Sequence, residues 1–114
     1  MPPQIYVNPS CSKCRTALSL PEEHGVQADT ILYLDDPPTV ADLEGLMELL
    51  TIDDPRLMMR TGEAVYAELA LDDADGDALL EAITHHPILL ERPIFVVADR
   101  AVVARPPERL LELL

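Results

Sequence analysis

The sequence predicts an α/β protein in which a four-stranded mixed sheet is built from two halves, with a run of helices inserted between them. Short β-prone apolar segments stand near both ends of the chain, whereas the middle carries apolar residues at helical spacing. Pro, Gly and Asp mark the boundaries between these segments. Because 114 residues suffice for one domain with its own core, we expect a single domain over 1–114 with the helical insertion at about 39–86.

The first half should contain a strand, a helix and a second strand. Residues 4–7 are β-prone and apolar, and Asn-Pro-Ser ends that strand, so a helix should begin near Ser10 or Cys11. Pro21 lacks a backbone donor and predicts a kink or break in this helix, and Gly25 should be its C-terminal cap. The second strand is expected at 30–34.

The middle of the chain should be helical throughout. After a turn at 35–39, Thr39 can cap a helix whose apolar residues recur at helical spacing over 40–50. Further helical segments are expected from Pro55 through Met59, at 66–69, and from about 75 to 86.

The second half should begin with a hairpin. Residues 94–98 and 101–104 read as strands joined by a tight connection at 99–100, and a final helix is expected at 107–114. The order βαβ, helices, ββα is a thioredoxin-like topology with helices inserted between its halves.

Charge and hydropathy exclude several classes of function. The net charge of −13 repels nucleic acid, so we expect no direct binding to DNA or RNA. An anionic substrate would require arginines gathered locally against this field. The apolar runs are too short to span a membrane, and no basic region precedes an apolar stretch at the N-terminus, so we expect a cytoplasmic protein without membrane contact. We also expect a monomer.

The two cysteines lie in one short segment, NPSCSKCR at 8–15, and form a C-x-x-C pair. At the start of a helix, backbone N–H groups and the helix dipole favour a thiolate, so Cys11 is the expected nucleophile. Lys13 and Arg15 add positive charge. Cys14, one helical turn further along, is placed to resolve a mixed disulfide.

Other interpretations of the pair are weaker. A zinc site requires about four ligands, and His24, His85 and His86 stand at no motif spacing, so we expect no metal. A structural disulfide that closes so short a loop stabilises little and would be reduced in the cytosol. Two incidental buried cysteines remain an alternative.

Five segments resemble the glutaredoxin-linked arsenate reductase family, in order, with family-like spacing and over essentially the whole chain. They are Asn8-Pro9-x-Cys11-x-x-x-Arg15, Asp36-Pro37-Pro38-Thr39, Leu57-x-x-Arg60, His86-Pro87-Ile88-Leu89-x-x-Arg92-Pro93-Ile94 and Arg105-Pro106. This resemblance implies a thioredoxin-like fold with a helical insertion, and arsenate reduction as the activity.

The resemblance also implies a role for individual residues. Cys11 matches the nucleophile that attacks arsenate and carries it as a covalent adduct, and Arg60, Arg92 and Arg105 match three oxyanion-binding arginines. Pro93 matches a proline that is cis in this fold and lies beside the active cysteine.

Three further residues complete the expected oxyanion site. Arg15 matches a basic residue in the first helix. Asn8 is expected to orient the cysteine loop or contact the anion, and Ser12 to offer a hydroxyl or backbone N–H, although Ser12 could equally serve only to start the helix. Arginine guanidinium groups and helix-start N–H groups are suitable donors for a tetrahedral oxyanion. Arg56, Arg100 and Arg109 are expected to be solvated surface charges or members of surface ion pairs.

Two positions depart from the family pattern. Val7 stands where the reductases carry a histidine, and Cys14 stands where they usually carry serine or threonine. The expected cycle uses an external thiol reductant and no bound cofactor. Glutathione with glutaredoxin is the usual reductant of the family, whereas a Cys11–Cys14 disulfide would suit thioredoxin.

Two alternatives from other functional classes remain open. Spx-type regulators share the fold and carry a C-x-x-C redox switch at this place, and they bind the RNA polymerase α subunit rather than act as enzymes. The other alternative is a thiol-disulfide oxidoreductase without arsenate activity.

Overall fold

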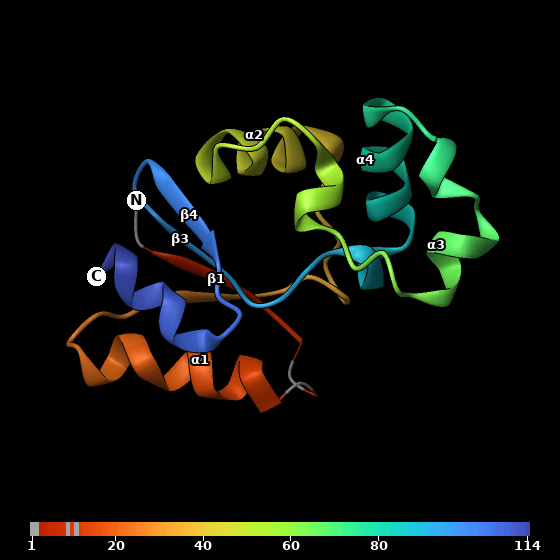
Figure 1. Ribbon diagram of the computed structural model, residues 1–114. Helices are drawn as coiled ribbons and strands as arrows, with labels where there is room; N and C mark the ends of the chain where they lie inside the picture. Colours follow the sequence, from red (N-terminus) through yellow and green to blue (C-terminus); the bar gives the residue numbers. More distant parts are fainter. Residues whose placement is uncertain (1–2, 9, 11) are drawn as a thin grey trace. The chain divides into compact units, whose positions relative to one another are not determined.

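The computed structural model describes residues 3–8, 10 and 12–114 (Figure 1). The predicted nucleophile Cys11 therefore lies outside the described residues, as do Pro9 and the side chain of Lys13. The chain forms two compact units, one made of the residues up to Asp36 together with Arg92–Leu114, and the other of Pro37–Glu91. The expected single domain with an insertion at about 39–86 stays a prediction.

The first unit contains the four-stranded mixed sheet, which confirms the predicted fold class. Its strands are β1 (Gln4–Val7), β2 (Asp29–Leu32), β3 (Ile94–Val97) and β4 (Arg100–Val103), in the spatial order β2-β1-β3-β4. Strand β1 is parallel to β2 and antiparallel to β3, and β3 is antiparallel to β4. The parallel pair requires a crossover, which α1 (Ser12–Glu23) supplies.

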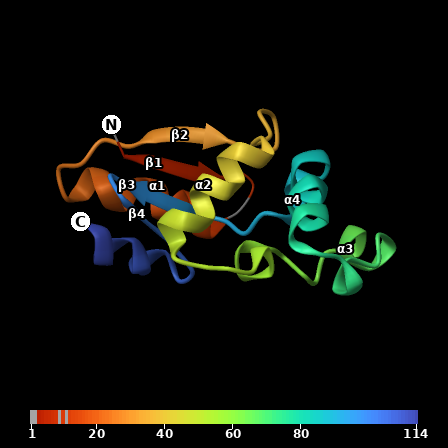
Figure 2. The same ribbon diagram turned by 90° about the horizontal axis from the view of Figure 1, so that it is seen from above.

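Helix α1 and the C-terminal 3-10 helix η4 (Pro107–Leu113) lie side by side against the sheet (Figures 1 and 2). Alternation along β1 points Ile5 and Val7 into the same core as Cys14 and Ala17 of α1. Phe95, Val102, Ala104 and Leu110 complete this core. The core therefore fixes the start of α1 against the end of β1, where the cysteine loop lies.

Pro21 does not break α1, contrary to one of the two predicted outcomes, and the helix continues through it to Glu23. The predicted cap at Gly25 is confirmed, since its φ of 75° lies in the left-handed region. The Gly25 N–H donates to Glu22 O over 3.0 Å, and the Val26 N–H donates to Pro21 O over 2.8 Å. These two bonds form a Schellman motif.

Strand β2 ends earlier than predicted. The backbone N–H groups of Asp35 and Asp36 both donate to Leu32 O over 3.0 Å, and this closes a turn directly after Leu32. Tyr33 and Leu34, which the β-prone pattern assigned to the strand, therefore belong to the turn.

The β3–β4 hairpin is confirmed, with its turn one residue earlier than predicted. Arg100 already pairs with Val97, so the two turn residues are Ala98 and Asp99, and Ala98 has a φ of 52°. Ala104 follows the strand instead of ending it, and its N–H donates to Pro93 O over 2.8 Å.

The second unit is helical, as predicted. It contains α2 (Val40–Leu50), η1 (Pro55–Met58), α3 (Ala64–Glu68), η2 (Leu71–Asp73), α4 (Gly76–His85) and η3 (Pro87–Leu89). Thr39 and Asp42 form a capping box at the start of α2, with bonds of 3.1 and 3.0 Å, which confirms the predicted cap. None of the helices in the described ranges combines the length and apolar character that a bilayer crossing requires.

Candidate functional site

The loop after β1 is organised by Asn8. Its backbone N–H lies 3.4 Å from the Sγ atom of Cys14, and its Oδ1 accepts a hydrogen bond of 3.0 Å from the Ser10 N–H. The second bond is the two-residue Asx pattern that stabilises turns. Asn8 thus connects the end of β1 to the first turn of α1, and this contact is consistent with its predicted role in orienting the loop.

The other predicted residues on α1 divide into one buried and two exposed side chains. Cys14 is completely buried in the core of the first unit. Ser12 and Arg15 are exposed at the start of the same helix. An external reagent therefore has no direct path to the Cys14 sulfur in this conformation.

Two of the predicted oxyanion arginines are joined by a hydrogen bond. The Nη1 group of Arg105 donates to the backbone carbonyl of Arg92 over 3.0 Å, and the peptide bonds that follow both arginines, to Pro93 and Pro106, are cis. Pro93 is buried, and its carbonyl accepts the Ala104 N–H bond described above. The segments that carry Arg92 and Arg105 are therefore held against each other.

The guanidinium group of Arg92 has buried donors that are not satisfied. Its Nε and Nη1 atoms are buried and have no hydrogen-bond partner among the described residues. A buried cationic donor without an acceptor is costly, and native proteins rarely keep one unless a ligand or ion satisfies it. The arrangement is therefore suited to an anion.

Arg60, the third predicted oxyanion arginine, belongs to the second unit. Its backbone N–H donates to Leu89 O over 2.7 Å, beside an isolated β-bridge between Met59 and Leu90. Its guanidinium group forms ion pairs with Glu63 and Glu91.

Arg56 has a structural role that goes beyond the surface charge or surface ion pair expected of it. Its Nε donates to Tyr66 Oη over 3.0 Å, and its Nη1 forms an ion pair with Asp54 over 3.5 Å. Its Nη2 donates to three backbone carbonyls, those of Leu71, Asp72 and Ala74, over 2.7, 3.1 and 2.9 Å. The hydrogen bond with Tyr66 raises the pKa of Arg56. Arg56 therefore holds η1 against η2, and the only local signal for it was the Asp54 two residues earlier.

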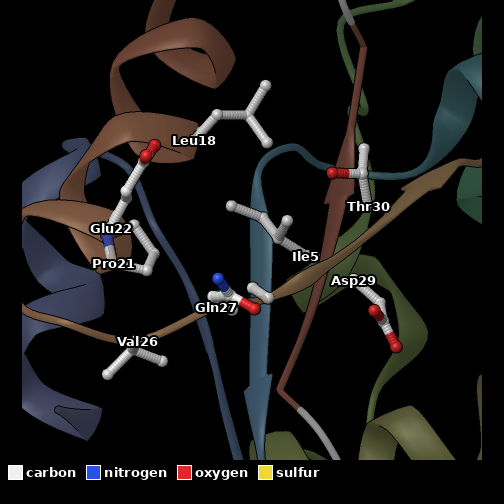
Figure 3. Close-up of a pocket in the computed structure, with 9 residues that line it drawn as sticks. Ile5, Leu18, Pro21, Glu22, Val26, Gln27, Asp29 and Thr30 are labelled. Atoms are coloured by element: carbon white, nitrogen blue, oxygen red, sulfur yellow. The ribbon is translucent and has the colours of Figure 1, made fainter.

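A cavity of about 350 Å³ in the first unit contains none of the predicted site residues (Figure 3). It lies at the C-terminal half of α1, whereas the cysteine loop precedes the N-terminus of that helix. Leu18, Pro21 and Val26 contribute apolar surface, and Glu22 and Asp29 contribute carboxylates. Carboxylates disfavour an oxyanion, so this cavity is not the candidate site.

Within the described ranges, no group of three or more His, Cys, Asp or Glu side chains is arranged to hold a metal ion.

Comparison with known proteins identifies the family. The model of the ArsC family matches residues 6–113. The chain belongs to the ArsC family. This confirms the resemblance read from the five sequence segments and agrees with the observed sheet and helices.

Individual relatives of this ArsC-family chain cover nearly its whole length. An arsenate reductase of Neisseria meningitidis serogroup A is 47% identical over 109 residues, which cover 94% of this chain and 93% of the relative. An uncharacterized protein of Escherichia coli K12, YfgD, is 42% identical over 112 residues, covering 96% and 94%. The solved structure of an arsenate reductase from Vibrio cholerae is 44% identical and superimposes with a TM-score of 0.96, covering 100% of this chain and 98% of that one.

Proposed function

We propose that this ArsC-family protein reduces arsenate to arsenite with a thiolate at Cys11. Arg60, Arg92 and Arg105 bind the oxyanion in this proposal. Family membership and the names of relatives at more than 40% identity support an oxidoreductase of this kind.

The observation that carries the proposal is the unsatisfied guanidinium of Arg92. Its buried Nε and Nη1 are donors with no acceptor among the described residues, and Arg105 is held on the Arg92 carbonyl. A tetrahedral oxyanion supplies several acceptor oxygens and a compensating negative charge. No metal or organic cofactor is required for this binding.

The chemical step that we propose balances in atoms and electrons. The Cys11 thiolate attacks arsenic(V), a sulfur–arsenic bond forms, and an oxygen leaves as water after protonation. A second thiolate then attacks the Cys11 sulfur, and the electron pair of the sulfur–arsenic bond stays on arsenic as arsenic(III). The two sulfurs are oxidised to a disulfide, which supplies the two electrons.

Cys14 or glutathione is the second thiol in this proposal. The C-x-x-C spacing and the position of Cys14 in the first turn of α1 favour Cys14. Its burial keeps the sulfur away from external reagents until Cys11 has reacted. Thioredoxin then resets the Cys11–Cys14 disulfide, whereas glutathione with glutaredoxin is the partner if Cys14 is dispensable.

The remaining predicted residues have supporting roles in the proposal. Asn8 orients the cysteine loop, consistent with its contacts to Cys14 and Ser10. Ser12 and Arg15 offer donors to the oxyanion from the exposed start of α1, and the buried Pro93, which directly follows Arg92, supports the site. We propose that the protein works as a monomer in the cytoplasm, where thiol reductants are available.

A single-turnover experiment tests the mechanism. Fully reduced protein is mixed with arsenate and no external thiol, arsenite is quantified by chromatography, and the disulfide is detected by intact mass. We expect stoichiometric arsenite with a Cys11–Cys14 disulfide. Cys14→Ser should form arsenite only after glutathione is added, and Cys11→Ser should form none. Full activity in Cys11→Ser would rule out the proposed nucleophile.

A further inference from the structure

The guanidinium group of Arg60 lies between two carboxylates of its own unit. Its Nη1 pairs with Glu63 Oε1 at 2.5 Å, and its Nε lies 3.7 Å from Glu91 Oε1. The three side chains are each about one quarter exposed, at 28%, 28% and 26%. They are therefore only partly screened by water, and a bound anion would encounter both carboxylates.

The two carboxylates occupy the edges through which a guanidinium group binds an oxyanion. A guanidinium offers a bidentate edge made of Nε and Nη2, and another made of Nη1 and Nη2. Glu91 lies at the first edge of Arg60, and Glu63 lies at the second. An oxyanion that approaches either edge therefore meets a carboxylate oxygen already at one of the two nitrogens.

Local structure indicates that the Glu63 side chain interacts with Arg60 and not with the helix that follows it. Glu63 occupies the N-cap position of α3, but its side chain makes no capping hydrogen bond to that helix. Glutamate is not among the residues that favour this position. The Glu63 carboxylate instead pairs with Arg60, and its backbone N–H donates to Arg60 O over 3.1 Å.

The backbone positions these groups independently of their charges. The Glu91 N–H donates to Met58 O over 2.8 Å, and the Arg60 N–H donates to Leu89 O over 2.7 Å. Because these main-chain bonds hold Arg60 and Glu91 close together, a side-chain substitution at Glu63 or Glu91 should leave the local fold in place.

We propose that Glu63 and Glu91 are positioning residues that hold Arg60 and lower its affinity for the oxyanion. This inference rests on the proposed role of Arg60 as an oxyanion ligand. With both carboxylates ionised, the three groups carry a net negative charge. The oxyanion must displace a carboxylate or share the guanidinium with it, so Arg60 binds more weakly than an unpaired arginine.

The test measures the dissociation constant of inorganic arsenate by isothermal titration calorimetry, in the Cys11→Ser background so that no turnover occurs. Glu63→Gln keeps an acceptor for Arg60 and removes the charge. We expect its dissociation constant to fall about two- to fivefold, the size of one partly screened charge pair. The matched control is Glu68→Gln at the exposed end of the same helix, which should leave the constant unchanged.

A double-mutant comparison shows whether the effect acts through Arg60. In an Arg60→Ala background, Glu63→Gln should no longer improve binding. In the active protein, Glu63→Gln should lower KM without raising kcat, which a merely structural role would not produce. Glu91→Gln should act in the same direction with a smaller effect, because its contact is longer.

The outcomes separate this inference from the proposed function. If Arg60→Ala weakens binding and Glu63→Gln leaves it unchanged or weaker, the inference is wrong and the oxyanion role of Arg60 stands. If Arg60→Ala binds arsenate as well as the parent protein, both the assignment of Arg60 and the inference fail. If neither the parent nor Glu63→Gln binds arsenate, the oxyanion site itself is refuted.

Discussion

Replacement of Arg92 by methionine should stabilise the protein while it abolishes oxyanion binding. Arg92 carries two buried donors, Nε and Nη1, that have no partner among the described residues. Methionine keeps an apolar stem of similar length and removes both donors. Substitution of buried charged groups by apolar ones of similar volume is often stabilising.

The size of this stabilisation follows from the free-energy cost of burying hydrogen-bond donors that have no acceptor. Each buried donor without a partner costs about 1–3 kcal/mol, and the half-buried position of Arg92 favours the lower part of the summed range. The two donors sum to about 2–6 kcal/mol, so we expect the free energy of unfolding to rise by about 2–3 kcal/mol in the absence of oxyanion. With an unfolding entropy of about 2 cal/mol/K per residue, a chain of this length gains about 4 °C in Tm for each kcal/mol.

The assay is thermal unfolding with and without arsenate. Arsenate should raise the Tm of the parent protein, because a ligand that binds only the folded state stabilises it. It should leave the Tm of Arg92→Met unchanged. The control is Arg100→Met on the exposed start of β4, which should change stability by less than about 0.5 kcal/mol. A lower Tm for Arg92→Met, or an arsenate-dependent rise equal to that of the parent, would refute this reasoning.

Three further predictions concern other parts of the molecule. Because Cys14 is completely buried, iodoacetamide should modify Cys11 but not Cys14 in the native protein, and should modify both cysteines in denaturant. Rapid labelling of Cys14 in the native protein, detected by peptide mapping, would contradict this. Arg56→Met should lower the Tm without changing arsenate affinity, because three backbone carbonyls lose their donor; an unchanged melting curve would show that water replaces it. Gly25→Ala should destabilise the protein by about 1 kcal/mol because Gly25 has a positive φ, whereas the control Gly45→Ala inside α2 should stabilise it by about 0.5–1 kcal/mol. Equal shifts of the two variants in urea denaturation would contradict the role of Gly25 as a helix cap.

Features that depend on a few neighbouring residues could be predicted from the sequence. The capping box at Thr39 and Asp42 spans four residues, and the Schellman motif at Gly25 spans six, so their chemistry is visible locally. The sheet could also be predicted, because its strands are short apolar segments and the parallel pair requires a crossover.

Features that depend on distant contacts could not be predicted in this way. Apart from Asp54, the partners of Arg56 lie 10 to 18 residues away along the chain, and Asp54 alone does not distinguish it from an arginine in a surface ion pair. The same holds for Arg105, whose partner Arg92 is 13 residues away. The ends of β2 and of the hairpin were missed by a residue or two, because turn hydrogen bonds at Leu32 and a left-handed Ala98 override β-propensity.

The candidate site could be predicted in part. A family resemblance identifies the arginines from the sequence. The structure adds that two buried donors of Arg92 have no acceptor among the described residues, and that Arg105 donates a hydrogen bond to the Arg92 carbonyl. The carboxylates on Arg60 were not foreseen, because acidic residues are so frequent in this chain that Glu63 and Glu91 carry no distinctive pattern.

Arsenate-dependent oxidation of NADPH tests the central claim most directly. Purified protein is assayed in parallel with thioredoxin and its reductase, and with glutathione, glutaredoxin and glutathione reductase. We predict turnover that requires arsenate in at least one of the two systems, and its loss in both Cys11→Ser and Arg92→Met. Absence of arsenate-dependent turnover in both systems, from folded protein with reduced thiols, would contradict the proposed function.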